Sequence, residues 1–132
     1  MKAIKDRPRV DFQEIDNTAA NHHAVNYCEE HYPETTKMYK DIMQEQYELF
    51  CKKQKNYGPG NISVGSNLET NDEVKLSLTG LWFRMNDKIQ RLKQLIILGH
   101  NDEVGESEQD TFQDLSVYGI IAQIVTAKKW GK

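Results

Sequence analysis

Three carboxylates at four-residue intervals form the most unusual chemical pattern in this sequence. Glu106, Asp110 and Asp114 would line one face of a helix, turn above turn, and that face runs on into residues that belong in a core. Buried carboxylates are costly unless they meet cations or a metal ion. Mg²⁺ prefers oxygen ligands, and its charge would relieve the mutual repulsion of the three carboxylates. The pattern therefore indicates a magnesium site or a cluster of ion pairs.

A structural explanation of the same residues also stands. Ser107-x-x-Asp110 matches a capping box, in which two side chains complete the first turn of a helix. Acidic side chains at a helix start are also favoured by the helix dipole. The sequence alone leaves both interpretations of Asp110 open.

A long apolar-striped segment supplies candidate partners for the carboxylates. Three cations and one carboxylate fall within about a third of a helical circumference: Arg84, Asp87, Lys88 and Arg91. A solvated face is the ordinary explanation for such charges. Placed beside the three carboxylates, however, this face would form a groove suited to a metal-bound polyphosphate.

Two further groups precede that segment. Lys53, Lys55 and Tyr57 lie just before a Gly-Pro-Gly bend, where cations suit phosphates and an aromatic ring can stack on a base. The same composition is common at a helix end. Glu45 and Glu48 lie three residues apart on one helix, where they form either a surface pair or part of a carboxylate cluster.

The elements that must position these residues are all helical, because apolar residues recur at steps of three and four and strand alternation is absent. The long helix has a continuous stripe: Leu78, Leu81, Met85, Ile89, Leu92 and Ile96. The last helix is apolar on nearly all sides, which predicts burial on nearly all sides. The predicted elements are an arm over residues 1–17, a polar helix over 18–32, a helix over 34–57, a loop over 61–71, and helices over 72–98 and from 106 or 107 to 129. Together they predict a compact all-α bundle of about four helices.

Composition narrows the classes of function. The 132 residues fit one domain, and 17 Lys+Arg against 20 Asp+Glu argue against a protein that coats nucleic acid. No signal peptide or membrane span is predicted, and Cys28 and Cys51 lack a disulfide-type spacing, so a cytoplasmic setting is expected. His22, His23, Cys28 and His31 do not follow the regular ligand spacing of a zinc site.

Three segments in order resemble the nucleotide modification associated domain 1 family of small phage and bacterial proteins. They are residues 51–58, 81–92 and 106–118, which match K-x-x-x-Y-G, R-x-x-D-K-x-x-R-L and E-S-x-x-D-x-x-x-D-x-x-x-Y. The resemblance covers roughly residues 43–125. It makes residues 34–132 the family core of one domain over 1–132, preceded by the arm and polar helix of 1–33. The genes that accompany this family imply a role in nucleotide metabolism around modified phage bases.

The family's helical make-up is similar to that of MazG-type all-α nucleotide pyrophosphohydrolases. Those enzymes hold Mg²⁺ with E-E-x-x-E and E-x-x-D clusters and split a nucleoside triphosphate into monophosphate and pyrophosphate. This sequence departs from both clusters: Gln44 occupies the place of the first Glu, and the later motif is Asp110-x-x-x-Asp114.

The resemblance implies a phage-type, Mg²⁺-dependent hydrolase of a (deoxy)nucleoside triphosphate in the host cytoplasm. Its catalytic residues would be Asp110, Asp114 and Asp87, and its metal ligands Glu48, Asp87, Asp110 and Asp114. Its substrate-binding residues would be Lys53, Lys55, Tyr57, Arg84, Lys88, Arg91 and Tyr118. It would act as a homodimer or larger assembly, with Trp82, Phe83 and Trp130 as candidate interface residues. The alternatives are a non-catalytic module that binds a nucleotide or a partner protein, and a structural bundle with neither activity.

Overall fold

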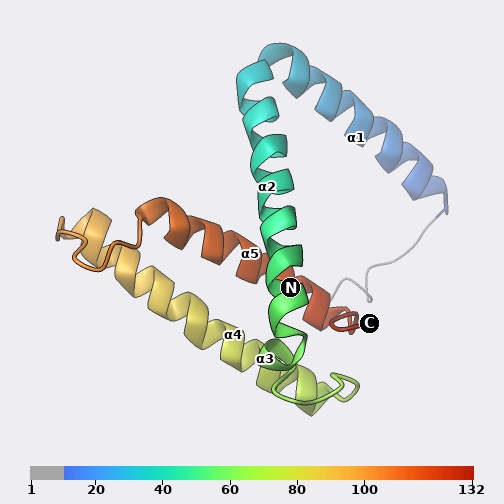
Figure 1. Cartoon of the computed structure of the whole chain (residues 1–132). Coiled ribbons are helices and arrows are strands. Elements are labelled where there is room, and N and C mark those ends of the chain that lie inside the picture. The colour runs from blue at the N-terminus through green and yellow to red at the C-terminus, as the bar shows by residue number, and fades with distance from the viewer. Residues whose placement is uncertain (1–10) are drawn as a thin grey trace.

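The computed structural model describes the backbone of residues 11–132 and the side chains of residues 18–132. Its elements are α1 (Asp11–His31), α2 (Pro33–Tyr57), α3 (Gly60–Ser63), α4 (Asn71–Leu92), the π-helical segment η2 (Lys93–Ile97) and α5 (Glu108–Thr126) (Figure 1). Residues 11–132 contain no strand, which confirms the all-α prediction, and four of the α-helices are long. None of the helices described in this range is long and apolar enough to cross a bilayer.

The first helix begins earlier than the sequence predicts. The predicted arm over residues 1–17 is wrong from residue 11 onward, because α1 already starts at Asp11; residues 1–10 lie outside the described residues. This helix lacks an apolar stripe, so periodicity does not reveal its start. The other predicted long helices match within a few residues, with the end of the third continuing as the π-helical segment η2.

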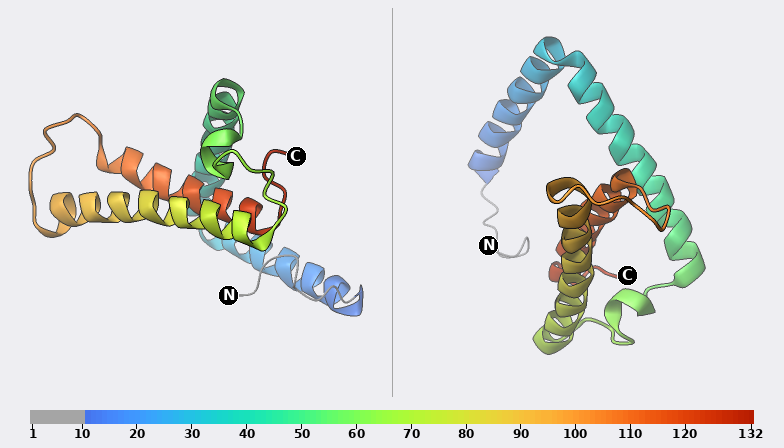
Figure 2. Two further views of the ribbon diagram at one scale, coloured as in Figure 1. Left: turned by 90° about the horizontal axis from the view of Figure 1, so that it is seen from below. Right: turned by 90° about the vertical axis from the view of Figure 1, so that its left-hand side faces the viewer.

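The helices divide into a packed body and a projecting arm (Figures 1 and 2). In the body, α4 and α5 run antiparallel along each other, and the C-terminal half of α2 crosses them. The arm, residues 11–44, consists of α1 and the N-terminal half of α2, which meet at the turn between them and diverge as an open V (Figure 2). Pro33 sits in the first turn of α2, where its missing N–H costs no helical hydrogen bond.

The body is closed by residues that follow α5, here called the C-terminal turn (residues 127–132). Trp130 is buried, donates from Nε1 to the carbonyl oxygen of Pro59 at 3.0 Å, and meets Phe50 edge to face at 6.0 Å between ring centroids. Lys128 Nζ donates to the carbonyl oxygen of Glu69 at 2.9 Å. The prediction that Trp130 serves an intermolecular interface is therefore wrong, because its ring is used inside the chain.

The core is small and lies where α3, α4, α5 and the C-terminal turn meet. Its fully buried apolar members are Ile62, Leu68, Leu81, Ile121, Val125 and Trp130. Ser77 is buried beside them, and its hydroxyl donates to the carbonyl oxygen of Ile62 at 2.6 Å. This bond ties the short helix α3 to α4.

Burial of the two body helices is one-sided. The prediction that the last helix is buried on nearly all sides is wrong within one chain, because Phe112 is 50% and Ile120 51% exposed. The predicted stripe of α4 is likewise only partly covered: Leu81 is buried, whereas Ile89 is 52% exposed. Within the described residues, the segments packed against the α4–α5 pair are the C-terminal half of α2, α3, the loop residue Leu68 and the C-terminal turn, and they leave other parts of both helices exposed.

Candidate functional site

A pocket of about 180 Å³ lies between the C-terminal half of α2 and the α4–α5 pair. Its apolar wall includes Leu49, Phe50 and Ile121. It brings together five of the predicted site residues: Lys53, Tyr57, Arg84, Asp114 and Tyr118. These five come from three segments that lie far apart in the sequence.

The helical register of α2 decides which of its polar side chains reach the pocket. Lys53 and Tyr57 lie one turn apart on the side that faces α4 and α5. Lys55 is about 200° around the helix from each of them, and it is exposed and outside the pocket lining. Glu48 also lies outside this lining, where it accepts a hydrogen bond from Gln44 Nε2 at 3.2 Å.

Two cations in the pocket lack a carboxylate partner. Within residues 18–132, neither Lys53 nor Arg84 has an ion pair within 4.0 Å. Arg84 instead donates from one terminal nitrogen to the carbonyl oxygen of Asn61 at 3.0 Å, which holds its guanidinium at the pocket. The charge of both side chains is therefore available to an anion.

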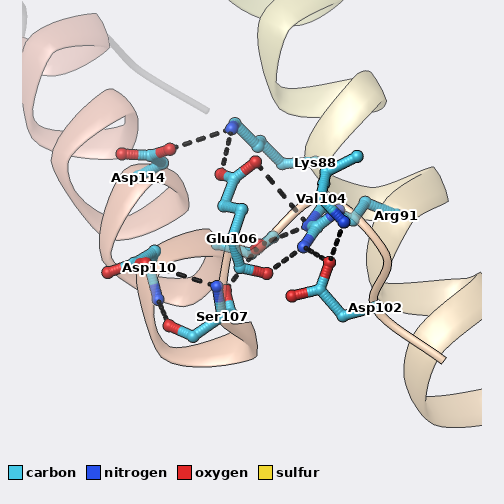
Figure 3. Close-up of polar contacts among 9 residues, drawn as sticks. Lys88, Arg91, Asp102, Val104, Glu106, Ser107, Asp110 and Asp114 are labelled. Carbon is cyan, nitrogen blue, oxygen red and sulfur yellow. Dashed lines mark hydrogen bonds and ion pairs between the residues drawn. The ribbon is translucent and has the colours of Figure 1, made fainter.

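The next cation along α4 is neutralised by the protein itself. Lys88 Nζ lies 2.7 Å from Glu106 Oε1 and 2.9 Å from Asp114 Oδ2 (Figure 3). The hydrogen bond to Glu106, aided by Asp114, raises the pKa of Lys88 above its ordinary value. Two of the three predicted carboxylates thus form an ion-pair cluster around one ammonium group.

Arg91, on α4, binds the segment between η2 and α5 (residues 98–107) through ion-pair and hydrogen-bond contacts. It lies 3.1 Å from Asp102 Oδ1 and donates to the Thr111 hydroxyl at 3.2 Å and to the backbone carbonyl oxygen of Glu106 (Figure 3). Desolvation opposes ionisation of Asp102, but hydrogen bonds from the Val104 amide and Arg91 hold its pKa below the usual value. Arg91 therefore orders the loop that delivers Glu106 to Lys88.

The remaining acidic predictions fall elsewhere. Ser107 Oγ accepts from the Asp110 amide at 3.0 Å and Asp110 Oδ2 accepts from the Ser107 amide at 3.3 Å, which confirms the capping box. Asp87 is exposed and lies outside the pocket lining. Among residues 18–132, no three His, Cys, Asp or Glu side chains are grouped so as to hold a metal ion. The proposed ligands Glu48, Asp87, Asp110 and Asp114 thus do not converge within one chain.

Amide side chains in the pocket wall escaped the sequence analysis. Gln46, Gln54 and Gln113 line it, and Gln46 Oε1 accepts from the Ser116 hydroxyl at 2.8 Å, joining α2 to α5. A signal for Gln46 was present, because it lies seven residues before Lys53 and so shares its helical face.

No known protein family, curated protein or solved structure matches this chain. The resemblance to the nucleotide modification associated domain 1 family therefore stays a prediction from the three sequence segments. Each of them contributes to the pocket: Lys53 and Tyr57 from the first, Arg84 from the second, and Asp114 and Tyr118 from the third.

Proposed function

We propose that the pocket binds a nucleotide, with phosphates at Lys53 and Arg84 and the base or sugar against Tyr57 or Tyr118. The observation that carries this proposal is the meeting in one pocket of two tyrosines and two cations that have no ion-pair partner among residues 18–132. Guanidinium and ammonium groups suit phosphate oxygens, and aromatic rings stack on bases of any kind. The family resemblance, with its link to nucleotide metabolism in phage DNA modification, points to the same ligand class.

The dimensions of the pocket restrict how the ligand sits. At about 180 Å³ it is smaller than the roughly 300–1,000 Å³ of sites that enclose a whole drug-sized ligand. A base or a sugar fits inside, while the phosphates lie towards the cations of the lining. The protein then serves as a nucleotide-binding module in a modification pathway.

Mg²⁺-dependent hydrolysis of a nucleoside triphosphate to monophosphate and pyrophosphate is the second candidate. Asp114 favours it, because this carboxylate lies in the lining of a pocket that also holds cations. Mg²⁺ takes about six oxygen ligands in an octahedron, and the lining of one chain offers a single carboxylate, already paired with Lys88 at 2.9 Å. The donor set of one chain does not fit the ion, so the binding function ranks first.

Thermal unfolding in the presence of common NTPs and dNTPs tests the proposal, each ligand with Mg²⁺ and with EDTA. A ligand at 100 times its Kd stabilises the folded state by about 2.7 kcal/mol, which raises Tm by several degrees. We expect a shift that survives EDTA, falls strongly in Lys53→Ala and persists in Lys55→Ala, the control on the other face of α2.

The outcomes separate the candidates. A shift that requires Mg²⁺, together with pyrophosphate release, would replace the binding function by the hydrolase. No shift with any nucleotide would overturn both. The predicted homodimer or larger assembly is a further part of the proposal, and exposed Trp82 and Phe83 are compatible with it.

A further inference from the structure

Helices α4 and α5 each carry two apolar lines, and among the described residues one line of each helix is covered whereas the other is largely exposed. The covered lines include Leu81 on α4 and Ile121 and Val125 on α5. The largely uncovered line of α4 consists of Leu78, Trp82, Met85 and Ile89, and of these Leu78 also packs against the core. The largely uncovered line of α5 consists of Phe112, Leu115, Gly119 and Ala122, and of these Ala122 also packs against the core. Trp82 is 60%, Ile89 52% and Phe112 50% exposed, and the others are partly buried.

The two uncovered lines lie side by side on one surface, here called the open face. Lys88 pairs with Asp114 and Arg91 with Thr111, which fixes the antiparallel register and puts Ile89 at the level of Phe112. Helical spacing places both lines on the side of the pair away from α2 and the pocket. The open face is therefore separate from the proposed nucleotide site.

The spacing of these residues is that of a helical-bundle seam. The α4 line advances by four, three and four residues, and the α5 line by three, four and three. Alternation of three and four is the pattern by which helices pack nearly parallel to one another in bundles. In a four-helix bundle each helix has two neighbours, but in this chain α4 and α5 each have one such neighbour along their length.

We infer that the open face binds the open face of a second copy, so that two α4–α5 pairs form a four-helix bundle with two-fold symmetry. None of the residues of the open face named above is charged. Two copies of this face can therefore meet about a two-fold axis, which brings each residue near its own counterpart, without placing like charges against each other.

The surface area supports a second copy. On the open face, the half-exposed Trp82, Ile89 and Phe112 alone present roughly 300 Å² of apolar surface, more than a third of the roughly 800 Å² that each partner buries in a stable interface.

The test is the solution mass of the full chain and of two matched double variants, measured by light scattering or sedimentation. Wild type at about 100 µM is expected at twice 15.3 kDa or a larger closed assembly. Ile89→Glu with Phe112→Glu should reduce it to one chain, because two charges then enter the bundle. Val25→Glu with Met43→Glu changes arm residues of equal exposure, 51% and 49%, and should leave the mass unchanged.

Other masses overturn the inference. A monomeric wild type would overturn it. So would an arm variant that no longer assembles, or an open-face variant that still assembles. Circular dichroism checks that each variant folds. If the open-face variant does not fold, acrylamide quenching of Trp82 fluorescence in the wild type tests the interface instead. Protection of Trp82 at assembly concentrations supports the open face, and free quenching of this exposed indole refutes it. The mass is read without nucleotide, so failure here leaves the pocket proposal intact.

Discussion

Two pairs of cations on the same side of the molecule are treated differently by the fold. Lys88 and Arg91 are held by Glu106, Asp102 and Asp114 at 2.7 to 3.1 Å. Within the described side chains, Lys53 and Arg84 have no carboxylate within ion-pairing distance, although Arg84 lies on the same helix one turn before Lys88. The first pair stabilises the loop before α5, and the second faces a pocket.

The difference shows that the availability of a cation depends on a remote segment. Residues 98–107 carry Asp102 and Glu106 to the C-terminal half of α4 and stop short of Arg84. A phosphate competing for Lys88 or Arg91 has to displace a carboxylate, whereas one at Lys53 or Arg84 displaces only water or a neutral group. Substitutions in the two pairs should therefore have opposite consequences.

The largest expected effect is that substitutions of the two arginines change different quantities: Arg84→Ala changes nucleotide affinity, and Arg91→Ala changes stability. Arg84→Ala should weaken nucleotide binding by about 10- to 100-fold, the worth of a charge-assisted hydrogen bond, with little change in stability. Arg91→Ala should leave binding within a few-fold but lower the free energy of unfolding by about 1–2 kcal/mol, because it releases Asp102 and Glu106 together. Calorimetric titration and urea unfolding measure the two quantities.

Equal effects of both arginines on binding would break the comparison. Equal effects would mean that the ion-pair cluster opens to admit phosphate, so that Lys88 and Arg91 bind the substrate as the sequence predicts. Arg84→Lys provides a control for charge, since it keeps the cation while losing the fork-shaped guanidinium.

A smaller effect is expected from pH at the loop. Because the folded pKa of Asp102 is lowered, its stabilisation is complete above the unfolded pKa of about 3.9 and is lost as pH falls through the folded value. The difference in Tm between wild type and Asp102→Asn should therefore be constant near neutrality and vanish in acid. A difference that grows on acidification would show that Asp102 is not held as an anion.

The smallest effect is predicted for Asp110, although the sequence analysis placed it among the catalytic and metal-binding residues. Asp110→Ala removes half of a capping box and should lower stability by roughly 0.5 kcal/mol. Nucleotide binding should be unchanged. Loss of binding or of turnover in a folded Asp110→Ala protein would restore this residue to a functional site.

The helices were predictable because their signals are local. Each signal determines a helix start or end within a few residues of itself. These signals are the proline at the start of α2, the Gly-Pro-Gly bend after it, and the capping residues Thr70 and Ser107. Burial was harder to predict, since an apolar position is covered only if another element reaches it. The exposed Phe112 and the buried Trp130 illustrate this, because their surroundings come from segments distant in the sequence.

The site was half predictable for the same reason. Lys53, Tyr57, Arg84, Asp114 and Tyr118 were chosen by residue type and motif, and the structure brings them to one pocket. Lys55 is a lysine like Lys53 but lies on another face of α2. The spacing of two residues between them already shows this. The pairing of Lys88 with Glu106 was not derivable, because the path of residues 98–107 fixes it.

The C-terminal turn has a consequence for the order of synthesis. Trp130 closes the bend after α2 from 71 residues further along the chain. During translation, α1, α2 and α4 emerge before the residue that completes their packing exists, and long-range contacts of this kind form late and slowly. The nascent chain therefore exposes the apolar residues of the core and of the pocket wall until residues 127–132 have left the ribosome, a period in which a chaperone would find apolar helices to bind.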